Sequence, residues 1–176
     1  MGLLDKIEVY MKQKLIEAYL AIRKFSSRII YEFVKVPEDK LPQKWDEIKK
    51  LPMYEFSKVL GRYEYKSDPF GGAIDYSPRN PNSFFVDKKN GRDCDDWARM
   101  WFWWCIENGK TPVYEVAICE KTNLVASHMV CIFEEQGEFF LLDYTPVGRF
   151  KTMEECALHN NVGIKDPIVA IYRKAI

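Results

Sequence analysis

One cysteine of the chain stands in a setting that could activate a thiol. Cys94 has three acidic neighbours, namely Asp93, Asp95 and Asp96. The pattern from 93 to 108 is helical and Gly109 follows as a stop, so Cys94 falls in the first turn of a helix. The amides and the macrodipole at a helix start favour an anion, which lowers the pKa of a thiol and increases its nucleophilic thiolate fraction. We also expect Asp93 to act as the N-cap and Asp96 to complete a capping-box-like contact.

The acidic neighbours of Cys94 oppose a thiolate, so a nucleophilic Cys94 needs a cationic partner. The competing interpretation is a core helix in which Cys94 is one more small hydrophobe. The helix is indeed apolar on nearly all faces, which indicates burial, through Trp97, Ala98, Met100, Trp101, Phe102, Trp103, Trp104, Cys105 and Ile106. That interpretation suits Cys105. It suits a cysteine among three aspartates less well.

His128 lies in the strand-like run SHMVCIF, where a core histidine with one hydrogen bond is the ordinary interpretation. A second run, FFLLDYTP, follows it, and the residues between them, Gln136 and Gly137, are typical of a hairpin turn. A two-residue turn places Asp143 opposite Val130, on the same face as His128. Such diagonal neighbours are about 7 to 8 Å apart. The Asp143 carboxylate can therefore reach the imidazole and fix its tautomer.

These three residues together are the parts of a Cys-His-Asp nucleophilic triad, formed by Cys94, His128 and Asp143. His128 supplies the cation that the acidic helix start lacks. A rival pair, Cys156 and His159, lies three residues apart on a short helix, but no orienting acid fits its pattern.

The pattern along the chain favours helices first and strands later. Short helices are expected around Trp45 and Phe56, and the Gly- and Pro-rich stretch from 63 to 91 is expected to form an ordered loop, not a helix. Strands are predicted at 113–119, 125–134, 138–144 and 168–172, with a short helix at 153–159. The fold class is α+β.

The first helix of the chain is long and amphipathic. Residues 3 to 34 contain neither Pro nor Gly, and Pro37 ends the pattern. Apolar residues recur at steps of three and four, at Leu4, Ile7, Met11, Leu15, Ala18, Ile22, Phe25, Ile29 and Phe33. This face can pack on its own domain, dock on a protein partner, or lie on a membrane surface with the basic face toward headgroups. We favour the first two.

Composition excludes several classes of function. Lys and Arg total 26 and so do Asp and Glu, so no overall charge attracts nucleic acid, and none is expected as a partner. Five cysteines at irregular spacing indicate a reducing, cytoplasmic setting, and neither a transmembrane segment nor a secretory signal is readable. With no CxxC pair and only two histidines, we expect no cofactor and no Cys/His metal site, whereas carboxylate-bound calcium stays open.

A family resemblance supports the same triad. GRDCDDWA resembles the G-D-C-D-D-aromatic-A signature of bacterial transglutaminase-like cysteine proteases, and SHMVCIF and FFLLDYTP resemble the His and Asp strands of that superfamily. The resemblance covers residues 60 to 146; Arg92 and the N-terminal helix depart from the pattern. It implies a papain-like core in which the nucleophile helix packs on an antiparallel sheet. Cys94 is then the nucleophile, His128 the general base and acid, and Asp143 the orienting residue.

We therefore divide the chain into an amphipathic helix at 1–36 and a transglutaminase-like catalytic domain at 37–176. The predicted activity is thiol-dependent acyl transfer at an amide bond of a protein or peptide substrate, with water or an amine resolving a Cys94 thioester. Asn80, Asn82 and Trp97 remain open as oxyanion donors beside the Cys94 amide. The main alternative is a non-catalytic assembly protein on the same fold that uses its N-terminal helix for interaction. A second one is a lytic enzyme acting on peptidoglycan cross-links.

Overall fold

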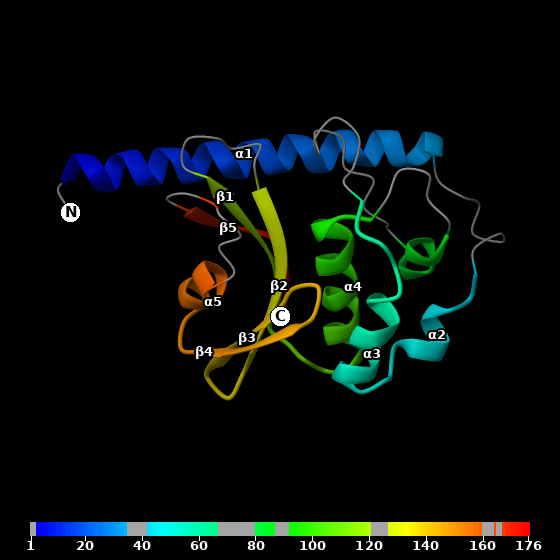
Figure 1. Cartoon of the computed structure of the whole chain (residues 1–176). Coiled ribbons are helices and arrows are strands. Elements are labelled where there is room, and N and C mark those ends of the chain that lie inside the picture. The colour runs from blue at the N-terminus through cyan, green and yellow to red at the C-terminus, as the bar shows by residue number, and fades with distance from the viewer. Residues whose placement is uncertain are drawn as a thin grey trace.

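The computed structural model describes residues 3–34, 42–66, 80–86, 92–120, 127–159, 164 and 167–176. These residues form an α+β fold around one antiparallel five-stranded sheet with the strand order β4-β3-β2-β1-β5 (Figure 1). In chain order the elements are α1 (Leu3–Val34), α2 (Trp45–Ile48), α3 (Met53–Leu60), the 3-10 helix η2 (Pro81–Phe85), α4 (Cys94–Glu107), β1 (Val113–Glu120), β2 (Ser127–Glu135), β3 (Glu138–Leu142), β4 (Pro146–Phe150), α5 (Met153–His159) and β5 (Pro167–Ala175).

The β2–β3 hairpin has the register that its turn residues predict. Gln136 and Gly137 both have positive φ, at 56° and 79°, as the first and second residues of a two-residue turn require. Glu135 consequently pairs with Glu138, and Cys131 pairs with Leu142. β3 ends at Leu142, two residues earlier than the strand pattern indicates, so Asp143 lies just beyond the strand. β4, which extends the sheet on the far side of β3, was not predicted from the sequence.

The sheet is covered by helices on both sides, with α4 on one side and α5 on the other (Figure 1). Alternate residues of β2 serve the two layers, because successive side chains of a strand point to opposite faces. Cys131 and Phe133 join the core around the α4 tryptophans. Val130 and Ile132 join a second core together with residues of α5. α4 is thus a central, buried helix, as its composition predicts.

α1 has the expected extent, but the described residues of its expected apolar stripe do not pack on the rest of the chain, so of the two favoured uses only docking on a partner stays a prediction. Ile16 and Leu20 are the residues that enter the core, where they pack with Ala117 of β1 and Ala170 of β5. The expected stripe is instead exposed, at Ile7, Met11, Leu15, Ile22 and Phe25. α1 carries apolar residues on more than one face, and the small alanines of β1 and β5 leave room for the side chains of Ile16 and Leu20. Among the described residues, no helix combines the length and apolarity that a membrane crossing requires.

A second correction concerns the stretch expected to be loop. Its residues 81 to 85 form η2, which begins directly after Asn80. The side chain of Asn80 accepts a hydrogen bond of 2.9 Å from the Asn82 amide, and Pro81 occupies the first helical position. An asparagine cap followed by proline is a typical helix start. Residues 67–79 and 87–91 of this stretch lie outside the described residues.

Candidate active site

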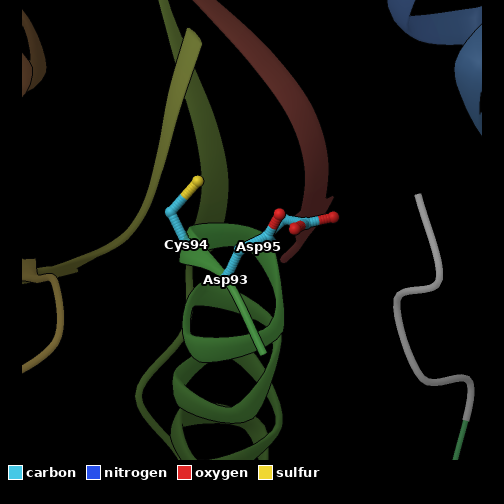
Figure 2. Close-up of side chains that lie close together, drawn as sticks. All are labelled: Asp93, Cys94 and Asp95. Carbon is cyan, nitrogen blue, oxygen red and sulfur yellow. The ribbon is translucent and has the colours of Figure 1, made fainter. Parts of the chain in front are cut away.

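Cys94 is the first residue of α4 and differs from the other cysteines in exposure. All five cysteines lie in the described part of the chain as thiols, and Cys94 is half-buried whereas the other four are buried. Asp93 takes the N-cap position, but its side chain makes no capping hydrogen bond to the described first turn, contrary to the predicted capping contact. Its carboxylate instead gathers with Cys94 and Asp95 at the helix start (Figure 2). The thiol therefore combines the favourable end of a long helix with access to solvent.

The acidic cluster at the start of α4 is the group of described residues best placed to hold a cation. Asp93, Cys94 and Asp95 each offer a ligand atom, and these atoms lie within 4.8 Å of one another. Figure 2 shows the two carboxylates together and the Cys94 sulfur set to one side of them. Hard cations such as Ca²⁺ take about six to eight oxygen ligands, of which two carboxylates supply a minority. A soft metal would find a single thiolate here.

His128 and Asp143 are in direct contact, as the hairpin register predicts. His128 Nε2 lies 3.0 Å from Asp143 Oδ1, and both side chains are buried. The backbone amide of Asp143 donates to the Thr145 carbonyl at 3.1 Å, which holds the chain in a tight turn just after β3. Because Nε2 faces the carboxylate, Nδ1 is the ring nitrogen through which a proton can pass to or from a thiol.

Tyr144 connects this pair to the start of α4. Its ring centroid lies 5.9 Å from that of His128 and 5.7 Å from that of Trp97, one turn along the helix from Cys94. Burial raises the pKa of the Tyr144 phenol well above its ordinary value, and the nearby Cys94 and Asp143 raise it further. The phenol therefore keeps its proton throughout the neutral range.

Arg92, which departs from the family signature, fastens the chain just before Cys94. Its side chain is buried and donates to the Phe84 carbonyl at 2.7 Å and to the Val86 carbonyl at 2.8 Å. Its guanidinium carbon lies 4.4 Å from the centre of the Tyr63 ring, at the distance of a cation–π contact. Arg92 therefore holds the start of α4 against η2.

The oxyanion candidates that the sequence left open have structural contacts. Asn80 caps η2, and Asn82 Oδ1 accepts from the Trp45 amide at 2.7 Å. The Asn82 amide nitrogen lies 3.4 Å from the side-chain oxygen of Gln43. Trp97 packs edge-on against Phe84, with ring centroids 5.3 Å apart. The two asparagines therefore organise η2 and its contact with α2.

The rival pair of Cys156 and His159 gains no support. Cys156 is fully buried, and burial raises its pKa to about 12. The His159 ring packs on Phe150, with centroids 4.8 Å apart. A thiol that stays protonated at neutral pH is a poor nucleophile.

Sequence reasoning missed a second buried charge cluster, which lies deeper along α4. Arg99 of α4 donates through Nε to Glu115 of β1, and both side chains are at most 3% exposed. Arg173 of β5 lies on the other oxygen of Glu115, at 3.4 Å. A signal was available, since Arg99 and Glu115 interrupt otherwise apolar runs, and charged residues are rarely buried unless paired. Their pairing with each other becomes evident only in the folded chain.

Comparison with known proteins gives a distant structural likeness. No model of a protein family matches the chain, and no curated protein matches it. Solved structures of Legionella pneumophila LapG, including an EGTA-treated and a calcium-bound form, are similar at a TM-score of 0.41 and 23% identity, over 81% of this chain and 81 to 83% of LapG. A TM-score this low carries no argument about activity. The chemistry of the chain is therefore inferred from its own residues.

Proposed function

We propose that this chain is a thiol-dependent acyl-transfer enzyme that cleaves or transamidates an amide bond of a protein or peptide substrate, on a papain-like core. The observation that carries the proposal is the 3.0 Å contact between His128 Nε2 and Asp143 Oδ1, with the Tyr144 ring packed both on His128 and on Trp97 of the helix that begins at Cys94. A buried histidine oriented by a carboxylate is what a general base requires. A half-buried thiol at a helix start is what a nucleophile requires.

The proposed reaction passes a proton between Cys94, His128 Nδ1 and the substrate. His128 Nδ1 takes the proton of the Cys94 thiol, and the Asp143 carboxylate stabilises the resulting imidazolium through Nε2–H. The thiolate attacks the amide carbonyl, forming a C–S bond while the π electrons move to oxygen. When the carbonyl re-forms, the C–N bond breaks and Nδ1–H protonates the departing amine. Water or a second amine then attacks the thioester, and its proton passes to Nδ1 as Cys94 is released as thiolate, which regenerates the imidazolium–thiolate pair.

The first test is selective alkylation. Each cysteine is treated with iodoacetamide from about pH 5 to 9 and its labelling rate is read by peptide mass spectrometry. We expect Cys94 to react at a pH well below the ordinary thiol pKa of about 8.5, and the four buried cysteines to stay unlabelled in the native protein. Equal rates for Cys94 and a free cysteine in a peptide would remove the main support for catalysis.

Matched variants tie the reactivity to the imidazole. His128→Ala should slow alkylation of Cys94 at neutral pH about 10²-fold, as the loss of a general base does. His159→Ala is the control, because His159 is the other histidine of the chain and its ring packs on Phe150 of β4. If both variants left the rate unchanged, His128 would have no part in activating the thiol.

A second candidate function is assembly through α1, and the exposed apolar residues of that helix favour it. Ile22 and Phe25 are 67% and 65% exposed. In this alternative, substitution of both by Ser would change the oligomeric state measured by sedimentation, and Cys94 would react as an ordinary thiol. If the chain is a thiol enzyme, the same double substitution should leave the alkylation rate of Cys94 unchanged.

A further inference from the structure

A reaction at an amide carbonyl needs a donor for the oxygen that becomes negative, and the sequence left its identity open. A preorganised donor at this point is often the largest single contribution to catalysis. The first-turn amides of α4, that of Cys94 included, supply one donor. Of the two asparagines that were candidates for the second, Asn80 caps η2 through its side-chain oxygen, and Asn82 accepts from the Trp45 amide and donates through its side-chain nitrogen to Gln43.

We propose that Tyr144 is a further catalytic residue, whose hydroxyl donates a hydrogen bond to the oxyanion formed when Cys94 attacks a carbonyl. This inference rests on the proposed function. Tyr144 directly follows Asp143, and its ring lies against His128 and against Trp97 of α4. Tyr144 is thereby held between the His128–Asp143 pair, which would transfer protons, and α4, which carries the Cys94 thiol.

The rigidity and protonation of Tyr144 suit this role. A third ring contact, with Tyr65 at 5.8 Å and nearly perpendicular, adds to the contacts with His128 and Trp97. An oxyanion donor must be neutral and must keep its proton while negative charge develops beside it. The raised pKa of the phenol, caused first by burial and then by Cys94, meets that requirement.

Two reactions of the same thiol separate this role from a structural one. Acylation by p-nitrophenyl acetate passes through a tetrahedral oxyanion: the C–S bond forms, the carbonyl electrons move to oxygen, and p-nitrophenolate leaves as the carbonyl re-forms. Alkylation by iodoacetamide displaces iodide at a saturated carbon and forms no oxyanion. A lost oxyanion donor therefore slows the first reaction only, whereas a distorted site slows both.

The test variant is Tyr144→Phe, which removes the hydroxyl and keeps the ring. We expect the p-nitrophenolate burst from Cys94 to slow about 10²-fold, the usual effect of losing one oxyanion donor. Alkylation of Cys94 should change by less than about twofold, because the thiolate–imidazole pair is intact. Tyr65→Phe is the matched control, since it removes the hydroxyl of the neighbouring ring, and it should leave both rates unchanged.

The possible results are distinguishable. Equal acylation rates in Tyr144→Phe and wild type would overturn the proposal, and so would a parallel loss of both reactions, which is the signature of a structural residue. A wild-type Cys94 that is alkylated selectively but never acylated would overturn the oxyanion donor and leave the activated thiol standing. A wild-type Cys94 with no special reactivity would end both proposals.

Discussion

Two buried charge clusters lie near α4, and they differ in whether they contain a residue that can transfer a proton. Near the start of the helix, His128 and Asp143 form a pair in which the imidazole can accept and donate a proton. Further along, Arg99 and Arg173 hold Glu115 between guanidinium groups that stay charged at any ordinary pH. The first cluster can move protons. The second cluster can only stabilise the packing of α4, β1 and β5.

The two clusters also differ in their exposure and in whether a solvent-accessible nucleophile lies near them. Tyr144 links the histidine cluster to the helix that begins at the half-buried Cys94, whereas Glu115 of β1 is 1% exposed and is paired with Arg99 of α4 and Arg173 of β5. Burial of charge alone is therefore a poor indicator of a catalytic site. A titratable group combined with a reachable nucleophile is a better one.

The largest effect should come from Cys94 itself. Cys94→Ala should abolish acylation by p-nitrophenyl acetate and leave the free energy of unfolding nearly unchanged, because the thiol is only half-buried. Cys105→Ala is the reverse case, since Cys105 is fully buried: it should keep the burst and cost about 1 kcal/mol of stability. Burst kinetics and urea unfolding measure the two quantities. A burst that survives in Cys94→Ala would place the chemistry elsewhere.

Breaking the arginine cluster should affect folding and spare the chemistry. Glu115→Gln leaves Arg99 buried without its carboxylate, and loss of one partner of a buried ion pair costs about 3 to 5 kcal/mol. The folded fraction should still alkylate at Cys94 at the wild-type rate. Glu138→Gln, which breaks an exposed pair with Arg149, should cost less than about 1 kcal/mol. If the two variants proved equally stable in urea, the Glu115 cluster would not stabilise the fold.

A smaller effect is expected when the His128–Asp143 pair keeps its geometry and Asp143 loses its negative charge. Asp143→Asn retains an oxygen that can face His128 Nε2 but no longer stabilises the imidazolium, so alkylation of Cys94 at neutral pH should slow about 10-fold or more. The pH profile of Cys94 alkylation by iodoacetamide should shift toward that of an ordinary thiol. An unchanged profile would show that Asp143 only packs against the ring.

The smallest effect concerns a thiol that we expect to be inert. Burial raises the pKa of Cys156 from 9.0 to about 12, so the folded state holds this proton more tightly than the unfolded state. The resulting stability is fully present below pH 9 and is lost as the pH rises from 9 toward 12. Urea unfolding at pH 8, 9 and 10 should show the decline, and Cys156→Ala should make it shallower, while the raised pKa of the buried Cys131 thiol maintains the rest. A decline of the same slope in the variant would assign it to other groups.

The local elements near the site could be predicted because each has a short-range cause. The turn residues Gln136 and Gly137 define the hairpin register, which in turn brings His128 to Asp143. The glycine at 109, with φ of 66°, marks the end of α4 as expected. Neither prediction requires knowledge of distant contacts.

Features that depend on distant partners could not be predicted. The inner face of α1 is chosen by the small residues Ala117 and Ala170, which lie far along the chain from Ile16 and Leu20. The role of Arg92 depends on carbonyl groups of Phe84 and Val86, which carry no side-chain signal. Tyr144 escaped notice because an aromatic residue beside Asp143 is ordinary in sequence and becomes informative only through its neighbours.

The contact of α1 with β5 has a consequence for the order of folding during synthesis. α1 is the first described element to leave the ribosome and β5 is the last, yet the cluster that covers Ile16 and Leu20 is completed by Ala170 of β5. Chains generally fold as domains emerge from the ribosome. The inner stripe of α1 must therefore stay exposed to water, or to a chaperone, until almost all of the described chain has been translated.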